Sequence, residues 1–117
     1  MLDKLFAALC ATGIPFKAYG WAVAPVTDYG VFSPEGEADA LWADGEQLAQ
    51  ATEGTIDLFC RSASRAAMEK VQAALRAMDG IAWRLLSTQF EEETKLVHYE
   101  WVFQVVTFCG EDASDGA

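Results

Sequence analysis

The hydrophobic and polar positions of residues 53–108 follow regular periods, which predict a strand, a helix and two further strands in succession. In the segment TIDLFCR, Ile56, Leu58 and Cys60 share one side of the chain, the two-residue period of a strand with an apolar face. Nearly all of the regular pattern in the sequence lies in this stretch. It predicts a sheet with one covering helix.

The predicted helix carries an apolar stripe at steps of three and four residues, which is typical of a helix packed against a core. The stripe consists of Met68, Val71, Leu75 and Met78. The hydroxyl of Ser62 or Ser64 is expected to cap the start of this helix. Asp79-Gly80 is expected to end it, because glycine readily takes the left-handed conformation.

The last two strands, Ile81–Glu91 and Lys95–Phe108, are expected to form a long antiparallel hairpin around a turn at residues 92–94. One face of the second strand carries Val97, Tyr99, Trp101, Phe103 and Val105, and the other carries His98, Glu100, Val102, Gln104 and Val106. Both faces are apolar towards the C-terminal end, and one helix covers only one of them. The second face therefore predicts a subunit interface. Its predicted members are Val102, Gln104, Val106 and Phe108.

The N-terminal half has weaker periodicity. Helical spacing predicts a short helix over residues 2–12, and aromatic-rich segments predict strands at Phe16–Val23 and Val26–Phe32. Proline and glycine predict a loop at Ser33–Glu37. Residues 38–48 fit a strand or a helix, with Asp44-Gly45 as a hairpin-type turn pair.

These elements predict an α+β fold: a mostly antiparallel sheet with a long C-terminal hairpin, one covering helix and a short N-terminal helix. At 117 residues we expect a single domain over residues 1–109, followed by a disordered acidic tail at 110–117. No apolar stretch is long enough to predict a membrane span. The N-terminus resembles an amphipathic helix more than a signal peptide, so synthesis in the cytoplasm is expected.

The charge is strongly acidic and unevenly distributed, with 18 acidic residues against 8 basic ones. No basic residue occurs between Lys17 and Arg61. That interval contains the acidic block Asp28, Glu35, Glu37, Asp39, Asp44, Glu46, Glu53 and Asp57. A nucleic-acid-binding protein needs basic side chains to neutralise phosphates, so sequence-specific nucleic-acid binding is disfavoured. The block is either a solvated surface or a surface that repels a polyanion.

Residues that could carry chemistry are few and scattered. The three cysteines are Cys10, Cys60 and Cys109. Their spacing matches neither a disulfide framework nor a structural zinc site, so reduced thiols are expected. One histidine, His98, without a cysteine pair does not predict a metal site. Asp57, His98 and Ser87 would form a triad only if the strands brought them together, and no nucleophile elbow or phosphate loop occurs. We expect no catalytic residues, cofactor or metal.

The segments EGTIDLFCRS, AAMEKVQAAL and WxLxSxQFEEETxLxHYEWxFxV together resemble the small tail-terminator or tail-completion proteins of long-tailed bacteriophages and prophages. They are also similar to short phage proteins found among head-tail joining genes. The resemblance extends over residues 1–108, including DYGVFSPEGEADALWADGEQLAQ. It implies a subunit of a ring, typically a hexamer, that caps the tail tube and joins it to the head. It supplies no catalytic residues.

The function predicted from this resemblance is a tail-terminator subunit, with itself, the tail tube protein and the head-tail connector protein as partners. The expected location is the virion, after synthesis in the bacterial cytoplasm, with no membrane contact. The acidic positions Asp39, Asp44, Glu46 and Glu53 are candidates for a lumen through which DNA slides without sticking. A head-tail connector is the alternative within the same class. A cytoplasmic dimeric α+β domain that binds a small ligand is the alternative outside it.

Overall fold

The computed structural model describes the backbone of residues 2–43, 46–62 and 64–108, and the side chains of these residues apart from 37–43, 46–50 and 107–108. The elements in chain order are α1 (Leu2–Cys10), β1 (Phe16–Ala18), β2 (Tyr29–Ala43), β3 (Glu46–Cys60), α2 (Ala66–Arg76), β4 (Ile81–Glu91) and β5 (Leu96–Phe108). The five strands form one sheet in the order β1-β2-β3-β5-β4. The predicted α+β class is confirmed.

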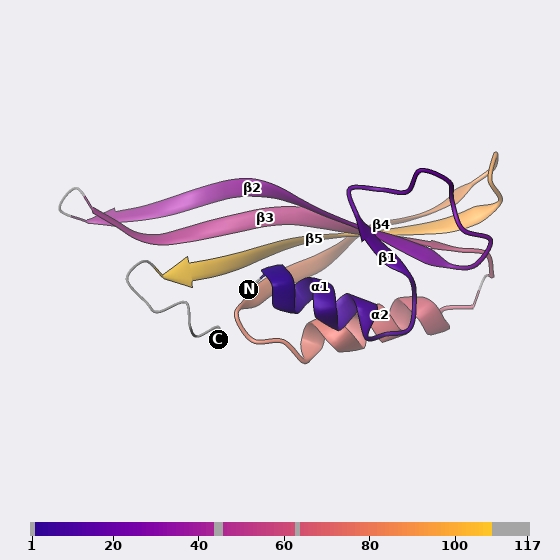
Figure 1. Cartoon of the computed structure of the whole chain (residues 1–117), viewed down its shortest axis with the longest axis horizontal. Helices are drawn as coiled ribbons and strands as arrows, with labels where there is room; N and C mark the ends of the chain where they lie inside the picture. The colour runs from indigo at the N-terminus through magenta and orange to yellow at the C-terminus, as the bar shows by residue number, and fades with distance from the viewer. Residues whose placement is uncertain (1, 44–45, 63, 109–117) are drawn as a thin grey trace.

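Both helices pack on the same face of the sheet, which we call the covered face (Figure 1). All neighbouring strands are antiparallel except β1, which pairs in parallel with residues 30–32 of β2. The opposite face, which we call the open face, has neither α1 nor α2 on it. Within the part of the chain that is described, no helix has the length and hydrophobicity to cross a membrane.

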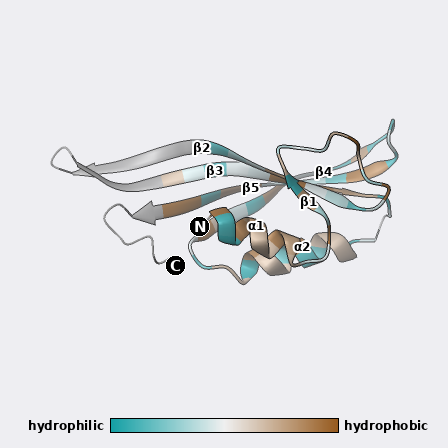
Figure 2. Ribbon diagram, in the orientation of Figure 1, coloured by the Kyte–Doolittle hydropathy of each residue, from teal (hydrophilic) through white to brown (hydrophobic). Residues whose placement is uncertain are grey.

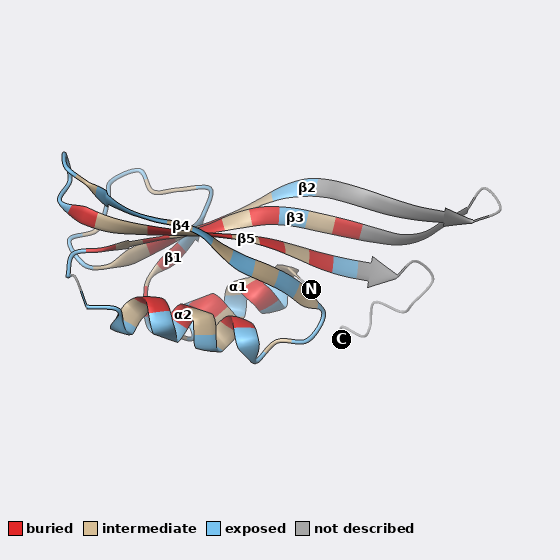
Figure 3. Cartoon of the chain, turned by 180° about the vertical axis from the view of Figure 1, so that it is seen from behind, coloured by how far each residue is buried: buried red, intermediate tan, exposed pale blue. Residues whose placement is uncertain are grey.

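The hydrophobic core fills the space between the covered face and the helices. Its fully buried members are Leu5, Leu9, Ile56, Leu58, Cys60, Met68, Val71, Leu75 and Trp101. Trp101 lies at the centre of β5 and its indole Nε1 donates a hydrogen bond to Gln72 Oε1 of α2 at 3.2 Å. Both helices are amphipathic, with hydrophobic and hydrophilic positions along each (Figure 2). The buried residues of α2 face the sheet (Figure 3).

Aromatic rings extend the core from α1 across the sheet. Phe6 stacks on Phe32 with ring centroids 5.6 Å apart, and Phe32 stacks on Phe103 at 5.5 Å. Gly54 lies beside the Phe103 ring, where an added Cβ would come within 2.8 Å of Cζ and would also collide with the carbonyl oxygen of Ser33. Because only glycine fits beside this ring, Gly54 permits the close packing of β2, β3 and β5.

The C-terminal half of the prediction is largely confirmed. β4 has the predicted bounds, and β5 begins one residue later than predicted because Lys95 takes a positive φ of 61° in the turn. The helix stripe is buried as expected, but α2 ends at Arg76, so Met78 lies beyond it. The predicted caps are wrong: the N-cap is Arg65, which makes no side-chain cap hydrogen bond, and the C-cap is Ala77, ahead of Asp79-Gly80. Ser64, one residue before the N-cap, accepts a hydrogen bond from the amide of Ala66 through its hydroxyl.

Two predictions for the N-terminal half are wrong. β1 ends at Ala18 and β2 begins at Tyr29, so residues 19–28 form a loop where the end of the first predicted strand, Phe16–Val23, and the start of the second, Val26–Phe32, were expected. Ser33–Glu37, predicted as a loop, belongs to β2. Its proline and glycine sit at a bulge between Pro34 and Gly36, where Gly36 has a φ of 127°. A bulge accommodates both residue types without ending the strand.

The segment that fitted strand or helix contributes to two strands, since β2 continues to Ala43 and β3 begins at Glu46. The predicted turn pair Asp44-Gly45 and the predicted tail at 110–117 lie outside the described residues. The molecule measures 53 × 26 × 25 Å, because β2, β3 and β5 continue well past the helices (Figure 1). The sheet is therefore covered at one end and extended at the other.

Candidate functional site

The strongest candidate site lies on the open face, where side chains alternate with those of the core. On β5, Phe103 and Val105 point to the covered face and are 2% exposed. Their neighbours Val102 and Gln104 point the other way and are half-buried, and Val106 is 43% exposed. The open face thus presents apolar and amide groups from the same strand that supplies the core.

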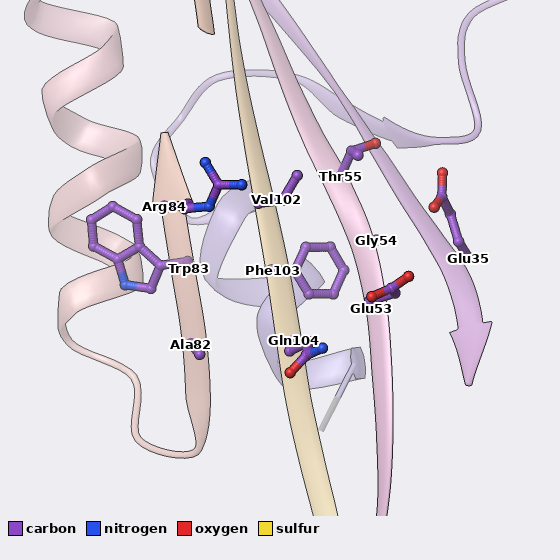
Figure 4. A pocket seen from close by; sticks show the side chains of 10 residues that line it. All are labelled: Glu35, Glu53, Gly54, Thr55, Ala82, Trp83, Arg84, Val102, Phe103 and Gln104. Atoms are coloured by element: carbon purple, nitrogen blue, oxygen red, sulfur yellow. The ribbon is translucent and has the colours of Figure 1, made fainter. Parts of the chain in front are cut away.

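A trough of about 470 Å³ crosses this face over four strands. Figure 4 shows its lining residues on β4, β5, β3 and β2. The cross-strand register forms one wall from Glu53, Gln104 and Ala82, and the other wall from Thr55, Val102 and Arg84. Between the walls lies the row of Gly54, Phe103 and Trp83. The side chain of Phe103 belongs to the core, and that of Trp83 packs against it. Two rows on the same side of a strand are about 7 Å apart, which is wide enough for an inserted side chain.

The trough is charged at both ends. Arg84 is exposed at its β4 end, and Glu53 and Glu35 are exposed towards β3 and β2. Among the side chains that are described, the only close pairs of acid and base involve His98, so none of these three groups has an ionic partner within that set. Their charges are free to contact another molecule.

The structure brings together three of the predicted site residues. Val102, Gln104 and Glu53 all line the trough, and Val106 lies farther along the same face of β5. Asp39 and Glu46 lie in the strands β2 and β3, with side chains outside the described set, as is that of Phe108. Asp44 lies outside the described residues. The predicted interface and the predicted acidic surface therefore meet at Glu53.

Two of the three charged residues of the trough, Arg84 and Glu35, were not predicted as site residues. They lie on different strands and share no sequence pattern with the predicted interface residues. Arg84 pairs with Val102 across β4 and β5, so the register of the hairpin would have placed Arg84 beside the predicted interface. Glu35 belongs to the segment that was predicted as a loop, and no such signal exists for it.

A second cluster occupies the open face around His98, nearer the β4–β5 turn. The Nε2 atom lies 2.7 Å from Asp57 Oδ1 on β3, and Nδ1 lies 3.3 Å from Glu91 Oε2 on β4. The ring stacks on Phe59 at 4.3 Å between centroids, and Phe59 stacks on Tyr29 at 4.9 Å. His98 thus connects three strands.

The electrostatics of this cluster follow from its carboxylates. The hydrogen bond to Asp57 raises the pKa of His98 above its usual value and outweighs burial, which lowers it. The charges of Asp57, Glu91 and Glu100 raise this pKa further. Burial also raises the pKa of Tyr29, with a further contribution from Glu91. The cluster therefore favours a positive charge at its centre.

The arrangement offers little for nucleophilic catalysis. Asp57 and His98 do meet, but His98 Nδ1 faces the carboxylate of Glu91, and Ser87 pairs with Glu100 in the strand register. Burial raises the pKa of the Cys60 thiol to about 11, with a smaller contribution from Asp28, so this thiol is protonated at neutral pH and a poor nucleophile.

The loop at residues 19–28 presents a different surface. Two hydrogen bonds anchor the loop to the sheet: Trp21 Nε1 donates to the Gly30 carbonyl, and the amide of Arg61 donates to Asp28 Oδ1. Val23 and Val26 at its tip are nevertheless 81% and 90% exposed. The loop connects β1 to β2 and lies on the side of the sheet opposite the helices (Figure 1).

The comparisons with known proteins concern the fold. The sequence matches no protein-family model and no curated protein. In structure, the chain is similar to one chain of a "Virion of native gene transfer agent (GTA) particle", with a TM-score of 0.59 and 17% sequence identity. The match covers 89% of this chain and 91% of the other, so the two share their fold over nearly their whole lengths.

Proposed function

We propose that this protein is a structural subunit of a phage-like particle, and that it forms the tail-terminator ring that caps the tail tube and joins it to the head. The observation that carries this proposal is the similarity in fold, over nearly the whole chain, to a component of a gene transfer agent virion. The resemblance in the strand and helix segments supports the same class. This role requires binding surfaces and no catalytic residues.

The open face supplies the surface that assembly needs. Val102, Gln104 and the trough between their rows provide apolar and hydrogen-bonding groups in one concavity, and Val106 continues the apolar surface. Exposed apolar side chains gathered on one face are typical of interaction surfaces. In a ring, each subunit inserts groups of one surface into a different surface of its neighbour. The trough, with Arg84 at one end and Glu53 at the other, suits the insertion of such groups.

The test of the ring is the mass and shape of the purified protein, alone and with its tail tube protein. We expect rings of about six subunits by native mass spectrometry and electron microscopy, as the resemblance implies. Val106→Glu places a charge on the open face and should leave a folded protein that no longer assembles, because a buried unpaired charge is costly. Val26→Glu, the same change at a valine 90% exposed on the loop, is the matched control and should assemble normally.

Three outcomes contradict the proposal. The first is a wild-type protein that remains a monomer or dimer even when mixed with tail tubes. The second is a Val106→Glu variant that assembles as well as the wild type. The third is a circular dichroism spectrum showing that Val106→Glu is unfolded, which would mean that this side chain is part of the core and not of an interface.

We further propose that the acidic strands β2 and β3 face the lumen through which DNA passes. The sequence of these two strands contains Glu35, Glu37, Asp39, Glu46, Glu53 and Asp57 and no basic residue. Like charge shortens the residence of DNA on such a surface. Changing Asp39 and Glu46 together to Lys, and leaving Glu53 of the trough unchanged, should slow DNA ejection while tails still form. Unchanged ejection kinetics would leave these strands as a solvated surface.

The neighbouring proteins distinguish a terminator from a head-tail connector. A terminator binds the end of purified tail tubes, and a connector of the adaptor or stopper type binds the portal of filled heads. We expect binding to the tubes. The trough volume also lies within the range of small-ligand pockets, so a dimer that binds a small molecule and ignores tail tubes would favour the ligand-binding alternative.

A further inference from the structure

We propose that Asp57, His98 and Glu100 on the open face form a binding site for a divalent transition-metal ion such as Zn²⁺. The candidate ligand atoms of these three residues, one from each, all lie within 4.8 Å of one another. They come from two adjacent strands: Asp57 pairs directly with Glu100, and His98 precedes Glu100 by two positions on the same face of β5. The proposal is independent of ring assembly.

The distances permit coordination after small side-chain rotations. A tetrahedral ion with bonds of about 2.1 Å holds its ligand atoms about 3.4 Å apart. Asp57 Oδ1 and His98 Nε2, now 2.7 Å apart, would separate by less than an ångström, and the Glu100 carboxylate would turn towards them. The side chains of Asp57 and His98 are each 19% exposed, so an ion can reach them from solvent.

The imidazole is oriented as metal-binding histidines usually are. Glu91 Oε2 lies 3.3 Å from His98 Nδ1, close enough for its charge to attract a proton on this nitrogen. In the metal-free protein Nε2–H donates a hydrogen bond to Asp57 Oδ1, so a binding metal ion would displace the Nε2 proton to solvent and take the lone pair that this leaves, while the proton on Nδ1 stays beside Glu91. A carboxylate behind a ligating histidine fixes the tautomer and raises the basicity of the ligand. Phe59, stacked at 4.3 Å, holds the plane of the ring.

The cluster has an excess of negative charge that a bound cation would neutralise. Asp57, Glu91 and Glu100 carry three negative charges around one imidazole, and among the described side chains no lysine or arginine lies within 4 Å of them. Repulsion between carboxylates is stronger in a partly buried site than in water. A doubly charged ion would offset it directly, and a proton on His98 offsets only one of the three charges.

The mixture of one nitrogen and two oxygen ligands selects the kind of ion. Imidazole suits Zn²⁺, Co²⁺ or Ni²⁺, whereas Mg²⁺ and Ca²⁺ prefer sites made of oxygen ligands alone. Three protein ligands leave at least one position for water or for a group from another molecule. Sequence spacing did not indicate this site, because Asp57 and His98 are far apart in the chain and adjacent only across β3 and β5.

The experiment uses the full chain, freed of any affinity tag and treated with EDTA, in a background with Cys10 and Cys109 replaced by Ser to remove competing thiols. His98 is the single histidine, so its ring ¹⁵N resonances report the site without ambiguity. Titration with Zn²⁺ should shift the Nε2 resonance at one equivalent. Calorimetry should give one site, and Mg²⁺ at the same concentration should cause no shift.

Four variants connect the signal to the proposed ligands. Glu100→Gln and Asp57→Asn each keep the size of the side chain, and each should weaken Zn²⁺ binding at least tenfold. Glu91→Gln should weaken it roughly tenfold, because it removes the carboxylate charge behind the ring. Glu93→Gln, an exposed acid in the adjacent turn, is the matched control and should bind as tightly as the wild type. The proposal is wrong if Zn²⁺ leaves the His98 resonances unmoved, or if Glu93→Gln and Glu100→Gln behave alike.

Discussion

The two faces of the sheet differ most clearly along β5, where one strand supplies both. On the covered face, Tyr99, Trp101, Phe103 and Val105 are at most 4% exposed under the helices. On the open face, Val102 and Gln104 are half-buried and Val106 is 43% exposed. The alternation of a strand distributes apolar residues to both sides, but the helices bury only one side. The covered face accounts for stability, and the side chains of the open face stay accessible.

The difference between the faces also extends to charge. Buried polar or charged residues are absent from the core among the described side chains. The open face carries Arg84 and Glu53 at the trough, and the carboxylates around His98. Arg84 and Glu53 are exposed and retain most of their hydration, so the face holds these two charges at small cost. We expect mutations on the two faces to separate folding from binding.

The largest effect should come from Trp101→Ala on the covered face. Trp101 is fully buried and its indole donates a hydrogen bond to Gln72. Removing a buried aromatic side chain costs about 3–5 kcal/mol of unfolding free energy, a large share of the stability of a small domain. Urea denaturation followed by circular dichroism measures the loss. A loss below about 1 kcal/mol would contradict the assignment of Trp101 to the core.

A matched pair of adjacent valines should then sharpen the comparison between faces. Val105→Ala on the covered face should cost about 2 kcal/mol, from two buried methyl groups at about 0.8 kcal/mol each and the cavity left behind. Val106→Ala on the open face should change the stability of the monomer by less than about 0.5 kcal/mol. Equal losses in the same urea experiment would show that the open face is covered within the monomer.

The smallest effect should be a pH dependence on the open face, measured in metal-free protein. The pKa of His98 is raised in the folded state by Asp57, Glu91 and Glu100. Its contribution to stability is therefore fully present below the unfolded pKa of about 6.5 and is lost as the pH rises through the folded pKa. His98→Gln should remove this part of the pH dependence of the urea midpoint. An unchanged pH profile in the variant would mean that the carboxylates do not stabilise the imidazolium.

Prediction from the sequence was most accurate where the hydrophobic period is longest. β4 was placed at its observed bounds, and the buried stripe of α2 was identified from Met68, Val71 and Leu75, because burial under one layer imposes a regular period. Prediction failed at Ser33–Glu37. Proline and glycine usually end a strand, and only the pairing with β3 shows that a bulge carries β2 past them.

The candidate site was predicted in part for the same reason. Val102, Gln104 and Val106 follow from the alternation of one strand, which the sequence displays. Arg84 joins them through the register of β4, and Glu35 joins them from the bulge in β2, where it has no partner in the register. The carboxylates of Asp57 and Glu91 reach His98 from two other strands. No pattern within a single segment contains these contacts.

The sequence by itself determined the α+β class, the hairpin of β4 and β5, and the division of β5 into two faces, because these depend on periods within single segments. The tertiary structure alone decided which face α1 and α2 cover, where the trough lies and which carboxylates surround His98. These features arise from the pairing of strands that are distant in the chain, and pairing depends on the packing of the whole sheet rather than on the local sequence.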